Sequence, residues 1–234
     1  ASIGRAGEFA RTQRGTVGAD LKYGLSSNLT LDAAINPDFG QVEADPSVLN
    51  LSAFEQFFGE RRPFFLEGTG IFRFDQDCND GACTGLFYSR RIGRAPQLGF
   101  LSPDFGAVPT SSTILGAAKV TGRLGNGLSI GILNAMTDRE LVGSDLEVEP
   151  RTNYFVTRLN QDLSQGRSGI GMILTAVNRD LEPNAQPYLR DAAYTAGIDA
   201  RHRFGGGGNY QASANVVGST VHGSAEAIAA TQRS

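Results

Sequence analysis

The chain has 234 residues, a formal net charge of −3, and only 19% charged residues. A nucleic-acid-binding domain would need a basic face, so we expect no nucleic-acid partner. No apolar run reaches the ~18 residues of a membrane helix, whereas β-strands can cross a bilayer with an alternating and mildly polar sequence. The composition therefore argues against membrane helices and leaves a β-barrel open.

The N-terminal residues 1–15 contain no apolar core of a signal peptide. We interpret this stretch as an N-terminal extension or linker. Either the protein stays in the cytoplasm, or the chain is an internal fragment of a longer protein.

Residues 16–36 predict a first β-hairpin. Odd-numbered positions from Val17 to Leu25 are apolar, and most positions between them are polar, which is the two-residue period of a strand with one apolar face. After a short turn at 26–28, the pattern resumes on the odd positions from Leu29 to Ile35. We therefore expect the two strands to pair.

Residues 114–218 predict three further hairpins with the same alternation. Their turns lie at 125–127, 163–167 and in the glycine run 205–208. Gly and Asn favour such turns because they tolerate positive φ angles. With the first hairpin, this makes an all-β fold of about eight strands in an antiparallel up-and-down meander. We expect residues 219–234 to be a truncated or disordered tail.

Strand length and loop length together favour a fragment of an outer-membrane β-barrel. Strands of about 9–13 residues suit a tilted crossing of a bilayer, and short turns alternate with longer polar connections. The alternative is a soluble antiparallel sandwich or lipocalin-like barrel, which alternates in the same way. In a membrane barrel, parity would direct five charged side chains into the lumen, namely Lys119, Arg123, Arg158, Arg201 and Arg203.

Six apolar side chains on the other parity separate these two alternatives. If they face outward in a continuous band, the membrane barrel is favoured; if they converge on one another in a core, the soluble domain is favoured. The six are Leu21, Leu31, Val120, Ile130, Ile170 and Ile198.

Residues 37–113 interrupt the meander, and we expect them to form a plug-like inserted segment with a short helix and strand. Between Asn36 and Phe74 the chain carries eight of its 14 Phe residues together with many carboxylates and guanidiniums. Aromatic rings favour burial, whereas charged groups resist it unless they are paired. A segment rich in both needs an enclosed yet polar place, which the interior of a barrel would supply.

Three motifs of this segment resemble the DUF5916 family: NPDFGQVEADP at 36–46, FEQFFGERRPFFLEG at 54–68 and FYSRRIGR at 87–94. Members are bacterial proteins in which a carbohydrate-binding family 9-like domain precedes a β-barrel-like region. The resemblance implies a location in the outer membrane of Gram-negative bacteria, with outer-membrane lipid as a partner. It also implies a role linked to saccharides, in binding, metabolism or transport, and a sugar-binding domain upstream of this chain.

The charged residues of the inserted segment form the candidate site. As a binding site, they would line a polar constriction or a sugar-binding surface, with the rings of Phe64, Phe65 and Tyr88 stacking on the saccharide. The candidates are Asp38, Glu43, Asp45, Glu60, Arg61, Arg62, Glu67, Arg90, Arg91 and Arg94.

The same residues also permit a purely structural interpretation. Arg61 and Arg62 would then pair with Glu60, Glu67 and the lumen-facing Asp32, because buried charges need partners. No residue pattern demands catalysis, and we predict no catalytic residue, no metal and no cofactor. The alternative function is a soluble or periplasmic β-rich module of a saccharide-hydrolysing protein.

The two cysteines, Cys78 and Cys83, lie close together in the chain. In an oxidising compartment they would close a small loop as a disulfide, and in the cytosol they would be free thiols. With only two His in the chain, they make a poor zinc site.

Overall fold

The computed structural model describes residues 17–37, 57–79 and 82–231. Of residues 75–79, 82–84 and 105, it describes the backbone alone.

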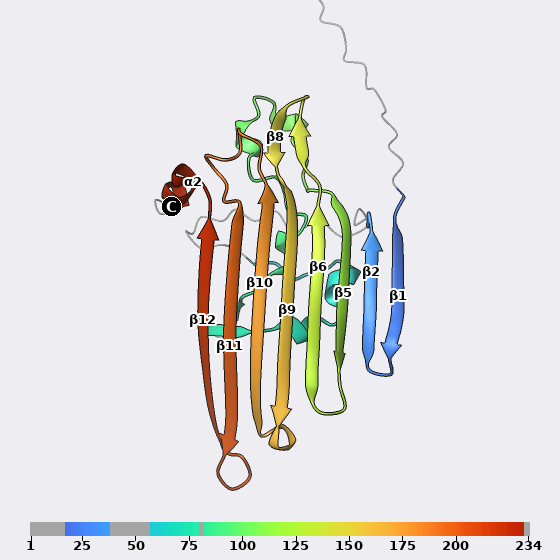
Figure 1. Ribbon diagram of the computed structural model, residues 1–234, viewed down its shortest axis with the longest axis vertical. Coiled ribbons are helices and arrows are strands. Elements are labelled where there is room, and N and C mark those ends of the chain that lie inside the picture. Colours follow the sequence, from blue (N-terminus) through green and yellow to red (C-terminus); the bar gives the residue numbers. More distant parts are fainter. Residues whose placement is uncertain (1–16, 38–56, 80–81, 232–234) are drawn as a thin grey trace, which may run out of the picture.

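Eight strands form one antiparallel sheet in which every strand pairs with the next one of the meander (Figure 1). This confirms the four predicted hairpins. The sheet is open, because the two edge strands do not pair with each other within the described part of the chain. The strands in sheet order are β1 (Ala19–Ser26), β2 (Leu29–Ile35), β5 (Ile114–Arg123), β6 (Leu128–Thr137), β9 (Arg151–Leu163), β10 (Ser168–Asp180), β11 (Ala192–Phe204) and β12 (Tyr210–His222).

Short turns and long connections lie at opposite ends of the sheet, as the sequence predicted (Figure 1). The turns after β1, β5, β9 and β11 gather at one end, where Gly127 and Gly205 adopt the positive φ angles of 84° and 86° that favour glycine. The connections after β2, β6 and β10 gather at the other end. The second of these holds a small hairpin that the sequence did not predict, β7 (Glu140–Val142) with β8 (Leu146–Glu149).

Residues 219–234, which we expect to be a truncated or disordered tail, form regular structure as far as residue 231. Strand β12 continues to His222, and a helix, α2 (Ala225–Thr231), follows it. The Ser224 hydroxyl accepts the backbone N–H of Ala227 at 3.1 Å, which caps the start of this helix.

The inserted segment, hereafter the insert, comprises residues 37–113, and its described part crosses one face of the sheet (Figure 1). We call this the inner face and the opposite one the outer face. The insert is built from short elements because its many Gly and Pro residues interrupt regular structure. These are α1 (Pro63–Leu66), η1 (Thr69–Phe72), β3 (Asp75–Asn79), β4 (Ala82–Gly85), η2 (Ser89–Arg91), η3 (Gly99–Leu101) and η4 (Phe105–Ala107).

The β3–β4 hairpin places Cys78 opposite Cys83 in its register. Their side chains lie outside the described part of the structure, so the disulfide between them stays a prediction.

The hydrophobic core lies between the insert and the inner face. Phe65, Phe72 and Phe74 of the insert are 2%, 5% and 1% exposed, and they belong to one cluster with inner-face residues such as Leu133 and Ile173. The predicted burial of aromatic rings is therefore confirmed for these three residues, but the cluster that surrounds them is largely apolar and not polar as expected.

Glycines on the inner face make room for these rings. A Cβ built on Gly131 would lie 3.0 Å from the Phe72 ring, and one built on Gly197 would lie 2.8 Å from the Phe74 ring. Both distances are too short for ordinary contact, so the insert can approach this closely only where the strands carry no side chain.

The apolar parity of the strands faces away from the insert. Leu21, Ile170 and Ile198 are 56%, 50% and 55% exposed, while Leu31, Val120 and Ile130 are half-buried. The six do not converge in a core. The structure therefore has the outward arrangement, which favours a membrane barrel over a soluble domain.

The inner face has the opposite character. Lys119 and Arg158, which parity directed inward, are 2% and 4% exposed beneath the insert. The inner face thus buries charged side chains beside the apolar core that it shares with the insert, whereas the outer face exposes large apolar side chains.

Candidate functional site

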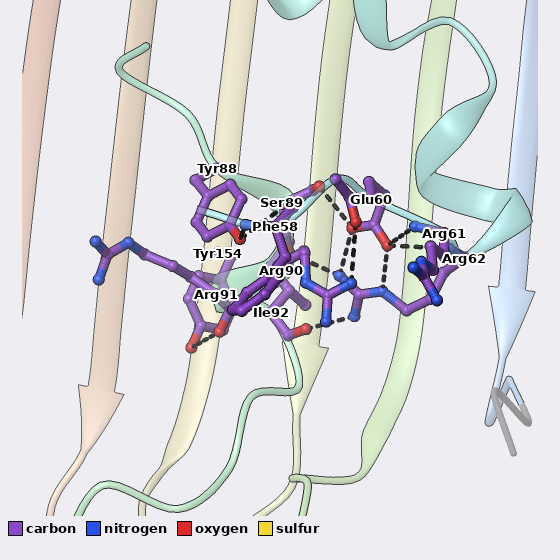
Figure 2. Close-up of polar contacts among 11 residues, drawn as sticks. Phe58, Glu60, Arg61, Arg62, Tyr88, Ser89, Arg90, Arg91, Ile92 and Tyr154 are labelled. Carbon is purple, nitrogen blue, oxygen red and sulfur yellow. Dashed lines mark hydrogen bonds and ion pairs between the residues drawn. The ribbon is translucent and has the colours of Figure 1, made fainter. Parts of the chain in front are cut away.

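The structure divides the predicted charge cluster into separate places. Asp38, Glu43 and Asp45 lie outside the described residues. Glu60 and Arg62 meet in one cluster, whereas Glu67 and Arg94 belong to two others. Arg61, Arg90 and Arg91 lie at the borders of the first cluster, which Figure 2 shows.

Glu60 and Arg62 form the centre of what we call the clasp, which consists of Glu60, Arg62, Ser89 and the carbonyl of Ile92. The Glu60 carboxylate accepts hydrogen bonds from Nε and Nη2 of Arg62 at 2.8 and 2.7 Å. It also accepts the Ser89 hydroxyl at 2.6 Å and the backbone N–H groups of Arg61 and Arg62, both at 3.0 Å. One carboxylate thus joins two segments of the insert that lie almost 30 residues apart (Figure 2).

The Arg62 guanidinium is equally engaged. Its Nη1 donates to the Ile92 carbonyl at 2.6 Å, its Nη2 also donates to the Ser89 carbonyl at 2.9 Å, and its plane lies 4.2 Å from the centre of the buried Phe65 ring. The side chains of Arg62 and Glu60 are 12% and 9% exposed. Nearly every donor and acceptor is used internally, so the pair fastens the insert to itself.

The environment of Glu60 favours its ionised form. Burial alone would raise its pKa, but the hydrogen bonds from the Arg62 side chain, the Ser89 hydroxyl and the Arg62 backbone outweigh burial and lower the pKa to about 2. Glu60 is therefore a carboxylate throughout the physiological range, and it cannot serve as a proton donor there.

Tyr88 extends the clasp on one side. Its hydroxyl lies 3.0 Å from both the N–H and the carbonyl of Phe58, and its ring packs edge-on against Phe57 at 5.1 Å. Arg90 adds a bond to the Gly59 carbonyl at 3.1 Å. The sequence offered Phe64, Phe65 and Tyr88 as rings for stacking on a sugar. For Phe65 that prediction is wrong, because the ring is buried beneath Arg62.

A second cluster anchors the insert to the sheet. Lys119 of β5 donates to the backbone carbonyls of Phe64 and Glu67, the latter at 2.6 Å, and lies 3.7 Å from Asp32 of β2. These carbonyls belong to the last turn of α1, where backbone acceptors lack partners within the helix. Lys119 supplies the missing donors and holds α1 against the inner face.

The structural interpretation thus holds in a changed form. Glu67 and Asp32 pair with lysines of the strands instead of Arg61 and Arg62, and the Glu67 carboxylate lies 2.5 Å from Lys22. The hydrogen bond from Lys22 lowers the pKa of Glu67. The alternation of the strand predicts that Lys119 faces inward. It does not predict that Lys119 anchors the insert, because its partners are backbone carbonyls that leave no pattern in the sequence.

A third group of charges lies among the long connections. Arg139 bonds to Glu147 at 2.7 Å, to Asp180 at 2.9 Å and to Glu182 at 2.5 Å, which ties the connection after β6 to the one after β10. Burial raises the pKa of Glu147. No pattern in the sequence indicates this group, because its members come from three separate segments.

The structure shows neither a metal centre nor a membrane helix within the part that it describes. Among those residues, no group of three or more His, Cys, Asp and Glu side chains is placed to hold a metal ion. No helix among them is long and apolar enough to cross a membrane.

The fold and these clusters define a class of protein: an open antiparallel meander whose inner face holds a charged and aromatic insert. Residues 4–226 match the family described as "Domain of unknown function (DUF5916)", and the chain belongs to this family. Neither the curated proteins nor the solved structures contain a match to the chain.

Proposed function

We propose that this chain forms part of the wall of a bacterial outer-membrane β-barrel, with the insert lying on the lumen side of that wall. Its role is non-enzymatic: the sheet contacts lipid through its outer face, and the insert narrows and shapes the interior.

The observation that carries the proposal is the outer face. Large apolar side chains are exposed there on strands from one edge of the sheet to the other, whereas soluble monomers rarely expose an apolar patch above a few hundred Å². These exposed side chains include Leu21, Tyr23, Ile132, Met136, Ile170, Met172, Leu174, Tyr194, Ile198, Phe204, Tyr210 and Val216.

Strand length and aromatic placement support it further. Strands β9 to β12 each have 13 residues, more than the ~9–11 that a tilted strand needs to cross a bilayer. Phe204 and Tyr210 stack at 5.6 Å at the short-turn end. Tyr194 and His222 pack at 6.0 Å towards the other end. Aromatic residues at both ends of an apolar band are the pattern of interfacial girdles.

The buried charges of the inner face fit the same assignment. Arg158 bonds to Asp199 at 2.5 Å and lies 5.1 Å from the Phe74 ring, and Lys119 is surrounded by the carbonyls of α1. A polar interior that contacts a plug and an apolar exterior that contacts lipid are the two faces of such a barrel. The family resemblance implies a saccharide ligand. In this proposal, the saccharide is the solute that would enter the barrel interior.

Fractionation of the full-length protein from its bacterial host tests the proposal. We expect it in the outer-membrane fraction after an alkaline carbonate wash, and in the detergent phase after phase separation. Recovery in the aqueous phase without detergent would overturn the proposal and favour a soluble β-rich module whose outer face is covered by another layer.

A further inference from the structure

Two arginines come together on the inner face near the long connections without a matching set of acidic partners. Arg179 projects from the inner face of β10, and Arg94 belongs to the irregular part of the insert after η2. Among the described residues, the ionisable groups that act most strongly on Arg179 are Tyr154 and Glu149, which favour its charged form, and Arg94 and Arg190, which repel it. Within the part of the chain that the structure describes, three guanidiniums therefore share their surroundings with one carboxylate.

That carboxylate is already in use. Glu149 is 2% exposed. It accepts the backbone N–H of Gln97 at 2.8 Å and the side-chain amide of Gln97 at 3.0 Å. It balances part of the positive charge without bonding to either Arg94 or Arg179 among the described contacts.

The donors of the two arginines are largely unused. The Nε atoms of Arg94 and Arg179 are both buried and have no hydrogen-bond partner within the described structure. The one hydrogen bond of the Arg179 side chain runs from Nη1 to the Arg190 carbonyl at 3.0 Å. Buried polar groups in native proteins nearly always have partners, so two orphaned donors of the same charge indicate a missing acceptor.

A third donor lies beside them. The charges of both arginines act on the side chain of Tyr154 of β9. Its hydroxyl interacts with the Thr152 side chain and donates to the Arg91 carbonyl at the long distance of 3.4 Å. A hydroxyl in so weak a hydrogen bond can turn to a better acceptor at little cost.

We propose that Arg94, Arg179 and Tyr154 form a binding site for an anion of the carboxylate or phosphate class. A planar guanidinium matches the two oxygens of such groups, and charge-assisted hydrogen bonds are the strongest that side chains make. Both arginines are half-buried, which leaves part of each within reach of a solute. A neutral sugar would not relieve the repulsion between the guanidiniums, whereas an anion does. The site rests on these contacts alone and does not depend on the membrane location.

Thermal unfolding and titration calorimetry of the full-length protein in detergent test this site with three probes. These are inorganic phosphate, galacturonate as a carboxylate-bearing sugar, and galactose as its neutral counterpart, all at constant ionic strength. We expect phosphate, galacturonate or both to bind and raise the unfolding midpoint, and galactose to leave it unchanged. Binding of galacturonate alone would identify an acidic saccharide as the source of the anion, and binding of phosphate alone a phosphate group.

Substitutions distinguish anion binding at this site from a nonspecific effect of positive charge. Arg94→Gln should lower the affinity for the bound anion at least tenfold, and in anion-free buffer it should leave the unfolding midpoint equal to or above that of the wild type, because it removes a repulsion. Arg94→Lys should bind with intermediate affinity, since it keeps the charge and loses the two-pronged geometry. Arg123→Gln is the control, because Arg123 already pairs with Asp162 at 2.5 Å and lies at the short-turn end of the sheet, away from the long connections.

Three outcomes would overturn the proposal. One is that neither anion shifts the midpoint beyond an equal ionic strength of sodium chloride. Another is that Arg94→Gln and Arg123→Gln lower the affinity equally. The third is that Arg94→Gln destabilises the protein to the same extent with and without the anion, as a purely structural arginine would.

Discussion

Replacing Glu60 by Gln should loosen the insert from itself. Gln keeps the shape of the side chain but removes the charge that five hydrogen bonds converge on. It would leave the Arg62 guanidinium, whose side chain is 12% exposed, without its counter-ion. A buried charge without a partner is strongly unfavourable.

Two independent considerations give the size of this effect. Removing one partner of a buried ion pair costs about 3–5 kcal/mol of unfolding free energy. The lowering of the Glu60 pKa from its ordinary 4.5 to about 2 corresponds to about 3 kcal/mol in favour of the folded state above pH 5. Both values agree, so we expect Glu60→Gln to reduce the free energy of unfolding by about 3 kcal/mol at pH 7.

The pH dependence gives the prediction its sign. The pKa of Glu60 is lower in the folded state, so its stabilisation is complete above the ordinary pKa and is lost as the pH falls towards 2. The difference in unfolding free energy between wild type and Glu60→Gln should therefore be full at pH 7, shrink below about pH 4.5, and vanish near pH 2.

Urea unfolding of the full-length protein in detergent, followed by circular dichroism and by the rate of tryptic cleavage within the insert, measures this effect. Glu67→Gln is the matched control in the same insert. Because the Glu67 side chain is 55% exposed and pairs with the exposed Lys22, its midpoint should stay near that of the wild type. The reasoning is refuted if the two variants behave alike, or if Glu60→Gln and wild type lose stability in parallel between pH 5 and pH 2.

Three further substitutions test the contacts between the sheet, the insert and the surroundings. Lys119→Met should cost about 2–4 kcal/mol in urea unfolding, because it leaves buried carbonyls of α1 without a donor; a cost near zero would contradict its anchoring role. Gly197→Ala should speed tryptic cleavage of the insert, since its Cβ would meet the Phe74 ring at 2.8 Å, while Gly218→Ala, with nothing within 4 Å, should not. Val216→Arg on the outer face should make folding into vesicles less favourable by about 2–4 kcal/mol, whereas Ser213→Arg on the inner parity of β12 should have little effect.

The sheet could be predicted from sequence because side chains of a strand alternate between its faces. Every hairpin of the meander carried that alternation. Gly127, Gly166 and Gly205 adopt positive φ in three of the turns, although Ser164 and Gln165 of the β9–β10 turn adopt it too. The same alternation predicts that the side chains of Lys119 and Arg158 lie on the inner face. The β7–β8 hairpin escaped prediction because strands of three and four residues are too short to show a period.

The candidate site was predicted in part. Glu60 and Arg62 lie two residues apart, and their pairing was expected. Their partner Ser89 lies 29 residues from Glu60 in the chain, and contacts at such separations depend on how the insert folds back. The cluster of Arg94 and Arg179 joins an irregular segment to a strand far along the chain, so only the three-dimensional structure brings it together.

The central claim is that the outer face of the sheet contacts lipid. Spin labels placed one at a time at positions 212–219 of β12, in full-length protein reconstituted into phospholipid vesicles, test it most directly. We expect even-numbered positions, which share the outer face with Val216, to collide mainly with oxygen dissolved in the bilayer. Odd-numbered positions, which share the inner face, should collide mainly with a water-soluble nickel complex. The account is contradicted if this alternation is absent or if the even-numbered positions favour the water-soluble reagent.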